Sequence, residues 1–245
     1  MIQNLLKFVW HHCPVFLKQP LKQSGISRAI WNAAAPAAPY EPDLLHLIQD
    51  LVKPGWICAD IGANVGTITV LLAKRATSSG LVYAFEAHPE NAEILRRNLK
   101  AENIANAKVE NLIVADGSQE RMWLYPGRGH SEAEWNIMGH DVEGNMTERE
   151  LSVAAVSLDE YFPPDARLDF VKIDVEGAEA MVIKGMRRLL QQSKPIVFVE
   201  FHDEQGWAGR KYFFESGYDL YDMNRRRQEP QENAARLYHC YFLPS

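Results

Sequence analysis

Short apolar runs alternate along this chain with segments of helical periodicity, and no other feature constrains the fold as strongly. The runs predict strands at residues 56–59, 81–85, 108–114, 168–173, 196–199, 218–221 and 237–242. Helical patterns occupy residues 44–52, 65–75, 89–100, 178–190 and 206–215. Strands that are apolar on both faces and are separated by helices are typical of a parallel sheet covered on both sides. The sequence therefore predicts a doubly wound α/β fold with a mostly parallel sheet.

Two segments depart from this rhythm. Residues 1–39 lack a clear strand pattern and end in an Ala- and Pro-rich run, which predicts an N-terminal helical arm and linker before a catalytic domain at residues 40–245. The arm is expected to lie across that domain, and a contact with a partner or a membrane surface is the alternative. Residues 116–157 predict an inserted β excursion with a long loop, where Trp135, Ile137 and Met138 favour a lid or substrate wall.

Charge and cysteine usage limit the kind of partner and the compartment. The 245 residues include 26 Lys and Arg against 32 Asp and Glu, a net charge of −6, which disfavours a nucleic-acid substrate despite the basic run at residues 225–227. The cysteines Cys13, Cys58 and Cys240 have neither disulfide nor zinc-site spacing and predict reduced thiols in a cytoplasmic protein. Neither a secretion signal nor a transmembrane segment is expected, because polar residues interrupt the apolar N-terminal stretch.

Residues 60–66, with the sequence Asp-Ile-Gly-Ala-Asn-Val-Gly, lie between an expected strand and an expected helix. Doubly wound sheets bind nucleotide-like ligands at such turns. Gly62 and Gly66 permit a tight bend, whereas Asn64 stands where the dinucleotide fingerprint needs its second glycine. Asp60 would repel a pyrophosphate but attract a ligand with an ammonium and a sulfonium group. S-adenosylmethionine carries both groups, so the turn predicts this cofactor.

Two further acids are candidates for the same ligand. Glu86 follows the strand expected at residues 81–85, where its carboxylate would accept hydrogen bonds from the ribose hydroxyls. Asp116 follows the next strand and could accept from the adenine amino group, although an ordinary Asp-Gly turn explains it equally well. The alternative for the pair Asp60 and Glu86 is that the first caps a helix and the second is simply exposed.

Residues 172–179, Lys-Ile-Asp-Val-Glu-Gly-Ala-Glu, lead from an expected strand into a helix. Strand alternation puts Lys172 and Asp174 on one side, and it puts Glu200 and His202 together on the next strand. A buried lysine needs a carboxylate partner, which these neighbours can supply. The four residues predict a catalytic constellation in which Asp174 or His202 takes a proton from an acceptor hydroxyl.

Two questions about this constellation stay open at the level of sequence. A divalent metal held by Asp174, Glu200 and His202 is conceivable, but a metal-free salt-bridge network is the expectation. Glu176 and Glu179 fall in the first turn of the expected helix, where acids ordinarily complement the helix dipole.

Three stretches resemble the hallmarks of the FkbM family of methyltransferases: residues 60–66, residues 85–89 (Phe-Glu-Ala-His-Pro) and residues 172–179. The resemblance covers roughly residues 54–202. It implies a Rossmann-like fold of the class I methyltransferase type, with S-adenosylmethionine as the methyl donor. It also assigns five residues to the cofactor site, namely Asp60, Gly62, Asn64, Gly66 and Glu86. Family members commonly have proline at the position of Ala87, so the geometry of this ribose-binding turn is expected to differ here.

The expected activity is methyl transfer to an acceptor, most simply a hydroxyl oxygen of a small molecule or sugar, by a protein that can form homo-oligomers. Trp135, Trp207 and the run at residues 225–227 are candidates to line the acceptor site, or else belong to the core or surface. A non-catalytic adapter that keeps the same fold is one alternative. A nicotinamide-dependent oxidoreductase is another, and Asp60 and Asn64 count against it.

Overall fold

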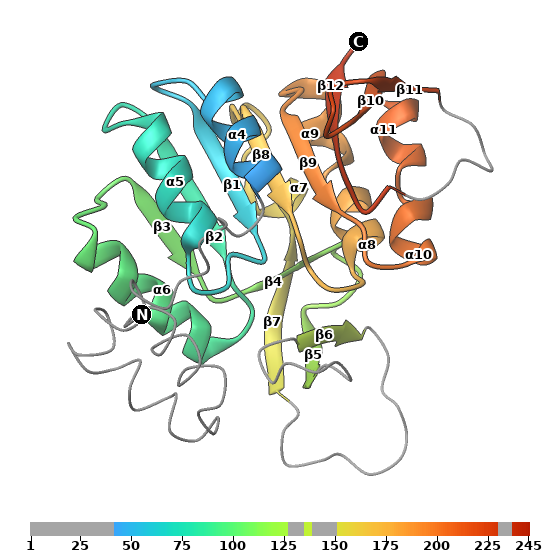
Figure 1. Cartoon of the computed structure of the whole chain (residues 1–245). Coiled ribbons are helices and arrows are strands. Elements are labelled where there is room, and N and C mark those ends of the chain that lie inside the picture. The colour runs from blue at the N-terminus through green and yellow to red at the C-terminus, as the bar shows by residue number, and fades with distance from the viewer. Residues whose placement is uncertain (1–41, 127–134, 139–150, 230–236) are drawn as a thin grey trace, which may run out of the picture. The chain divides into compact units, whose positions relative to one another are not determined.

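The computed structural model describes residues 42–126, 135–138, 151–229 and 237–245 (Figure 1). Its contacts divide the chain into two compact units, Met1–His46 and Leu47–Ser245. The predicted arm at residues 1–39 lies outside the described residues, so its helical character and the domain boundary at residue 40 stay predictions. The first described element is helix α4 (Pro42–Leu51).

Among the described residues, eight strands form the main sheet, in the order β11-β10-β12-β9-β8-β1-β2-β3. In chain order they are β1 (Ile57–Ile61), β2 (Leu81–Phe85), β3 (Ala107–Glu110), β8 (Phe170–Ile173), β9 (Ile196–Glu200), β10 (Tyr218–Asp222), β11 (Arg227–Gln228) and β12 (His239–Pro244). The five strands from β9 to β3 are parallel, whereas β10, β11 and β12 pair in an antiparallel manner at one edge. This confirms the mostly parallel α/β sheet.

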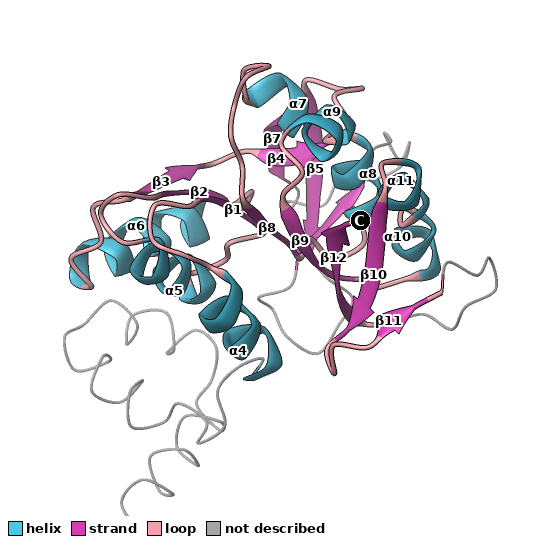
Figure 2. Ribbon diagram, turned by 90° about the horizontal axis from the view of Figure 1, so that it is seen from above, coloured by secondary structure: helices cyan, strands magenta, loops and turns pink. Residues whose placement is uncertain are grey.

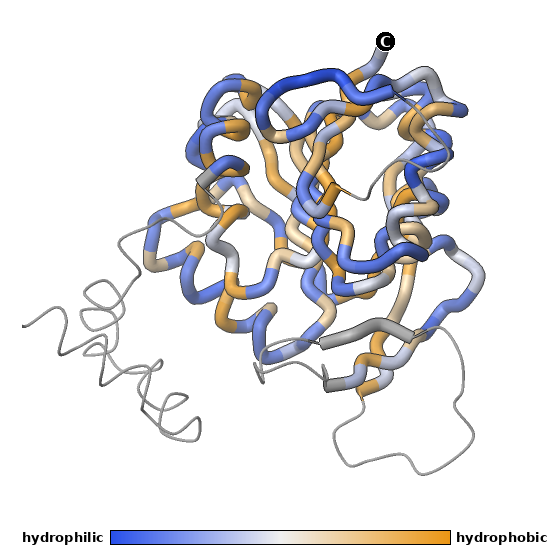
Figure 3. Tube along the Cα trace, turned by 45° about the vertical axis from the view of Figure 1, so that its right-hand side comes forward, coloured by the Kyte–Doolittle hydropathy of each residue, from blue (hydrophilic) through white to orange (hydrophobic). Residues whose placement is uncertain are grey.

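Helices cover both faces of this sheet, as a doubly wound fold requires (Figure 2). One face carries α5 (Thr67–Ala76) and α6 (Pro89–Ala101). The other face carries α7 (Leu158–Tyr161), α8 (Glu179–Lys184), α9 (Arg187–Gln192), α10 (Glu204–Ala208) and α11 (Lys211–Glu215). Hydrophobic residues are concentrated in the central strands, and the helices alternate between hydrophobic and hydrophilic positions (Figure 3). The core therefore lies between the sheet and its two helical layers.

Two helices that the periodicity predicts as continuous are each broken at a glycine. The segment 178–190 forms α8 and α9, separated at Gly185, where a Cβ would lie 2.0 Å from the carbonyl oxygen of Ala115. The segment 206–215 is divided between α10 and α11 at Gly209, where a Cβ would lie 2.8 Å from the Cα of Ala180. Hydrophobic periodicity continues through both breaks, so a sequence pattern does not reveal them.

The predicted β excursion is present as a second sheet. Its strands are β4 (Ile113–Ala115), β5 (Arg121–Pro126), β6 (Trp135–Met138) and β7 (Leu151–Ser157), in the order β4-β7-β5-β6. The single strand expected at residues 108–114 is thus split between two sheets, with the chain leaving the main sheet at Asn111. Residues 127–134 and 139–150 lie outside the described residues, so the predicted lid or substrate wall stays a prediction.

Cys58 and Cys240 are buried free thiols, as the cysteine spacing predicts, and Cys13 lies outside the described residues. Within the described part of the chain, every helix is too short or too polar to cross a lipid bilayer.

Candidate active site

The chain reverses its direction across the sheet between β1 and β8, which are neighbours at its centre. From β1 it proceeds outward to β2 and β3, and from β8 it proceeds the opposite way to β9. Doubly wound sheets bind ligands at the carboxyl ends of the strands that flank such a reversal. Here those ends carry the turn at residues 60–66 and Asp174, so folding brings the two predicted motifs to one place.

Glycines keep this turn close to its neighbours. Gly62 has φ +75°, and a Cβ at this position would lie 1.8 Å from the carbonyl oxygen of Asp174. The amide of Asp174 donates to the carbonyl of Ile61 at 3.1 Å, which holds the ends of β1 and β8 together. Gly66 has φ +93°, and a Cβ there would lie 2.1 Å from Cδ1 of Leu95. Both predicted turn positions therefore require glycine for conformation and for space.

Asp60 is fully buried beneath the turn. Its Oδ2 accepts a hydrogen bond from the Thr69 hydroxyl at 2.6 Å, and its Oδ1 lies 3.5 Å from Nζ of Lys172. Lys172 is itself 3% exposed; it donates to the carbonyl of Gly62 at 2.9 Å and pairs with Asp174 at 3.1 Å. The carboxylate partners expected for Lys172 thus include one from β1, because the strand register sets Lys172 beside Asp60. We propose that Asp60 supports the turn from below and does not meet the ammonium group of a cofactor directly.

Glu86 lies directly after β2 and is 7% exposed. Its two carboxylate oxygens accept hydrogen bonds from the amides of Asn64 (2.7 Å) and His88 (2.8 Å). A carboxylate offers about four acceptor positions, so capacity remains for a ribose hydroxyl. The side-chain amide of Asn111 donates to the carbonyls of Glu86 (2.9 Å) and Ala87 (2.8 Å) and fixes the turn that departs from the family pattern. The sequence did not predict this role for Asn111, because the residue lies within a run expected to be a strand.

The ionisation of Glu86 predicts how cofactor binding depends on pH. Burial raises the pKa of Glu86, against the opposing effect of the amides of His88 and Asn64, so this carboxylate becomes protonated at a higher pH than an exposed glutamate. We therefore expect affinity for S-adenosylmethionine to fall as the pH is lowered, and to begin falling at a higher pH than the ionisation of an exposed glutamate would produce. Calorimetric titration at a series of pH values measures the effect, with Glu86→Gln as the non-titrating control. An affinity of the parent protein that does not change with pH would contradict it.

Asp116 has partners of a different kind. Its Oδ1 accepts hydrogen bonds from the amide and hydroxyl of Ser118, at 3.0 and 2.6 Å, and its Oδ2 pairs with Lys184 of α8 at 2.8 Å. It lines a shallow pocket together with residues of α8, α10 and α11. These contacts favour the ordinary turn, and the adenine-binding role of Asp116 stays a prediction without support from the geometry.

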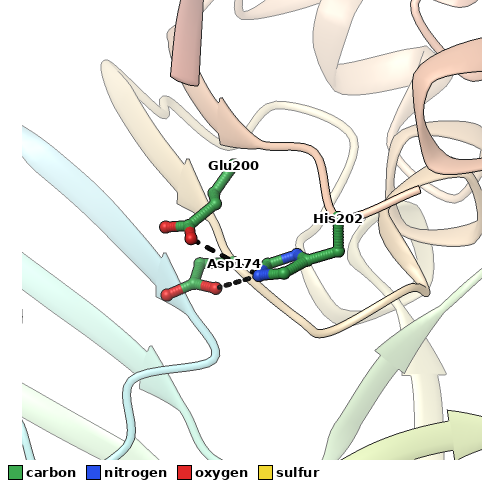
Figure 4. Close-up of side chains that lie close together, drawn as sticks. All are labelled: Asp174, Glu200 and His202. Carbon is green, nitrogen blue, oxygen red and sulfur yellow. Dashed lines mark ion pairs between the residues drawn. The ribbon is translucent and has the colours of Figure 1, made fainter. Parts of the chain in front are cut away.

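The predicted constellation is assembled at the carboxyl ends of β8 and β9. His202 Nε2 lies 3.7 Å from Oδ1 of Asp174 and 3.4 Å from Oε1 of Glu200, and the three side chains point toward one another (Figure 4). Lys172 reaches Asp174 from the opposite side. Alternation along the two strands therefore placed all four residues correctly.

One member of the cluster was assigned too small a role by the sequence analysis. Glu179 does accept from the amide of Gly177 at 3.0 Å at the start of its helix, but it is also fully buried and contacts His202 Nδ1 at 2.6 Å. Glu176 lies 3.5 Å from His202 Nε2. No local signal connects Glu179 with His202, because the two residues meet only after β8 and β9 have paired.

The carboxylates around His202 control its charge. Burial alone would lower the pKa of His202, but hydrogen bonds to Glu179 and Glu200 and the negative charge of Glu176 outweigh it and raise the pKa to about 10. At neutral pH this imidazole accordingly carries a positive charge.

The residues predicted as candidates to line the acceptor site lie in different parts of the fold. Trp207 is 3% exposed and belongs to the hydrophobic core. Arg225 pairs with Asp50, and Arg227 pairs with Asp219 at 2.6 Å. Trp135 is the first residue of β6.

A doubly wound sheet with a glycine turn after β1, beside the point of chain reversal, and an acid at the tip of the neighbouring strand β2 forms a site for a nucleotide-like ligand. A model of the methyltransferase FkbM domain matches residues 60–232. The chain belongs to the FkbM family of methyltransferases. Family membership also removes the nicotinamide-dependent alternative.

Two curated relatives resemble this chain in sequence, and one solved structure shares its fold. The chain is similar to the hexuronic acid methyltransferase AglP of Haloferax volcanii, with 28% identity over 169 residues, 66% of this chain and 62% of the relative. It is also similar to the 2-O-methyltransferase NoeI of Sinorhizobium fredii, with 23% identity over 177 residues, 67% of this chain and 71% of the relative. The crystal structure of methyltransferase FkbM from Methylobacillus flagellatus shares the fold, with a TM-score of 0.50 and 14% identity over 92% of this chain and 57% of that chain.

Proposed function

We propose that this protein transfers a methyl group from S-adenosylmethionine to a hydroxyl oxygen of a sugar or related polyhydroxylated small molecule. The observation that carries the proposal is the direct contact of the cofactor turn with Asp174, whose carbonyl oxygen occupies the place where Gly62 would have a Cβ. A proton acceptor therefore lies next to the turn that binds the methyl donor. The names of AglP and NoeI, a hexuronic acid methyltransferase and a 2-O-methyltransferase, support an acceptor of this chemical class.

The residues present fit the cofactor. Glu86 is buried, ionisable and already oriented by two amides, as a carboxylate that receives a ribose hydroxyl should be. The glycine turn leaves the backbone of residues 62–66 without side-chain cover at two positions. S-adenosylmethionine supplies an electrophilic methyl group on a sulfonium centre when it is bound.

The chain's own residues then serve the acceptor. As the acceptor oxygen forms a bond to the methyl carbon and the carbon–sulfur bond breaks, the hydroxyl proton passes to the carboxylate of Asp174. Lys172 at 3.1 Å and His202 at 3.7 Å hold this carboxylate in place. Orientation of the reacting groups supplies much of the expected rate enhancement.

Replacement of Glu86 tests the cofactor site. Glu86→Gln should weaken S-adenosylmethionine binding about tenfold or more, because an amide accepts less strongly from a ribose hydroxyl and its NH₂ group faces an amide that formerly donated to the carboxylate. Calorimetry on the parent and variant measures the change. Glu90→Gln, the same substitution at an exposed position of α6, is the matched control and should bind like the parent. Equal affinity in all three proteins would remove Glu86 from the cofactor site.

Identification of the acceptor tests the chemistry itself. The protein is incubated with isotopically labelled S-adenosylmethionine and an extract of source cells, and labelled products are located by mass spectrometry. We expect the label on a hydroxyl oxygen of a carbohydrate-like compound. A label on nitrogen or carbon would overturn the proposed class of reaction, and binding of the cofactor without any transfer would support the non-catalytic adapter.

A further inference from the structure

We infer that a divalent cation of the Mg²⁺ or Mn²⁺ type binds between Asp174, Glu200 and His202, in the space faced by the imidazole Nε2. One ligand atom from each of these side chains lies within 4.8 Å of the other two. Two carboxylates with one imidazole form an oxygen-rich donor set that suits these ions. A metal-free salt-bridge network is the alternative that the experiment below distinguishes from this site.

The three side chains are arranged so that one ion could lie between them. Nε2 of His202 lies 3.4 Å from Oε1 of Glu200 and 3.7 Å from Oδ1 of Asp174. Two ligand atoms that are each about 2.1 Å from one ion lie about 3.0 to 3.4 Å apart in octahedral or tetrahedral arrangements. The separations in the cluster reach up to 4.8 Å, so the side chains would move closer together on binding one ion.

The orientation of His202 is that of a metal ligand. Glu179 is fully buried and holds Nδ1 at 2.6 Å, so that Nε2 is directed toward the carboxylates. Metal-binding histidines usually give their second nitrogen to a carboxylate in this way, which fixes the tautomer and the ring orientation. Glu179 does not share the open side of the cluster and would act as the orienting partner of the ligand.

The carboxylates around His202 form a region of excess negative charge that favours the binding of a cation. Four carboxylates, those of Asp174, Glu176, Glu179 and Glu200, lie within 4 Å of the ring nitrogens of His202. Glu200 is only 8% exposed, and its Oε2 lies 3.3 Å from Nε2 of His239. So many carboxylates close together and largely buried are costly, and a cation in the cluster would lower that cost.

The position of the ion gives it a role if the proposed function is correct. It would lie beside Asp174, next to the cofactor turn, where it could bind the acceptor oxygen and lower the pKa of that hydroxyl. A metal-bound imidazole is neutral, so binding of the ion would release the proton of His202 to solvent. Oδ1 of Asp174 would bind the ion, and Oδ2, which lies at Lys172, would accept the hydroxyl proton. Binding of the ion itself does not depend on methyl transfer, so it can be tested without cofactor or acceptor.

The test is a titration of chelator-treated, full-length protein with Mn²⁺, followed by the electron paramagnetic resonance signal of the free ion. We expect one tightly held Mn²⁺ per chain. Glu179→Gln should weaken its binding about 10- to 100-fold, the usual effect of removing the partner of a metal-bound histidine, and Asp174→Asn and His202→Gln should weaken it at least as much. Thermal unfolding verifies that each variant is folded.

Two matched control variants show whether any loss of Mn²⁺ binding is specific to the cluster. Glu215→Gln and Asp219→Asn remove exposed or partly exposed acids that pair with arginines elsewhere in the fold, and both should bind Mn²⁺ like the parent. Absence of stoichiometric Mn²⁺ binding in the folded parent, or equal binding in parent, cluster variants and controls, would overturn the inference. A Mn²⁺ site in a protein that transfers no methyl group would leave the ion assignment standing and refute the proposed function alone.

Discussion

Gly62→Ala should lower the free energy of unfolding by about 3 kcal/mol and abolish measurable S-adenosylmethionine binding. A left-handed backbone at a residue with a Cβ costs about 1 kcal/mol, and forcing an extra methyl group into a packed region typically costs a further 1 to 3 kcal/mol. The new Cβ would lie 1.8 Å from the carbonyl oxygen of Asp174, a backbone atom that cannot rotate away. The ends of β1 and β8 must therefore separate, and the cofactor turn moves with them. Thermal and denaturant unfolding, with calorimetry for the cofactor, measure both effects.

Gly217→Ala is a closely matched control. Gly217 has φ +76°, against +75° for Gly62, and a Cβ there would meet nothing within 4 Å. It should cost only the conformational penalty of about 1 kcal/mol, equivalent to about 2 to 4 °C in Tm for a chain of this size. If the two substitutions are equally destabilising, close contact between the turn and Asp174 is not what holds the site together.

Asp174→Asn should slow methyl transfer to the identified acceptor by about 10²- to 10⁴-fold while changing cofactor affinity little. General base catalysis commonly contributes a factor of this size, and an amide cannot accept the hydroxyl proton. The backbone of residue 174, which contacts the turn, is unchanged by this substitution, and Lys172 keeps Asp60 as a counter-charge. Single-turnover kinetics with labelled donor measure the chemical step, and calorimetry measures cofactor binding.

The same chemical change at Asp219, on the antiparallel edge of the sheet, should leave the rate unaltered. Normal turnover by Asp174→Asn would exclude this residue as the proton acceptor. A parallel loss of cofactor affinity would instead show that its charge, together with Lys172, maintains the turn.

Much of the parallel sheet could be predicted because each of its strands is a local apolar run. β2 coincides with its expected range, and β9 extends it by one residue, since burial on both faces requires continuous hydrophobic sequence there. The breaks at Gly185 and Gly209 could not be predicted. Gly185 packs against the backbone of Ala115, and Gly209 packs against Ala180. Both partners are distant in sequence, so the local pattern carries no sign of these contacts.

For the site, local sequence was sufficient for the glycine turn, the acid after β2 and the pairing of Lys172 with Asp174, because strand alternation and the strand-to-helix turn are properties of short segments. It did not predict the complete burial of Asp60 and Glu179. Asp60 is buried against Lys172 and Thr69, and Glu179 is buried against His202. The burial of a charged side chain and the identity of its partners are decided only when separate strands and helices pack together. The electrostatic properties of the site are therefore determined by the tertiary structure.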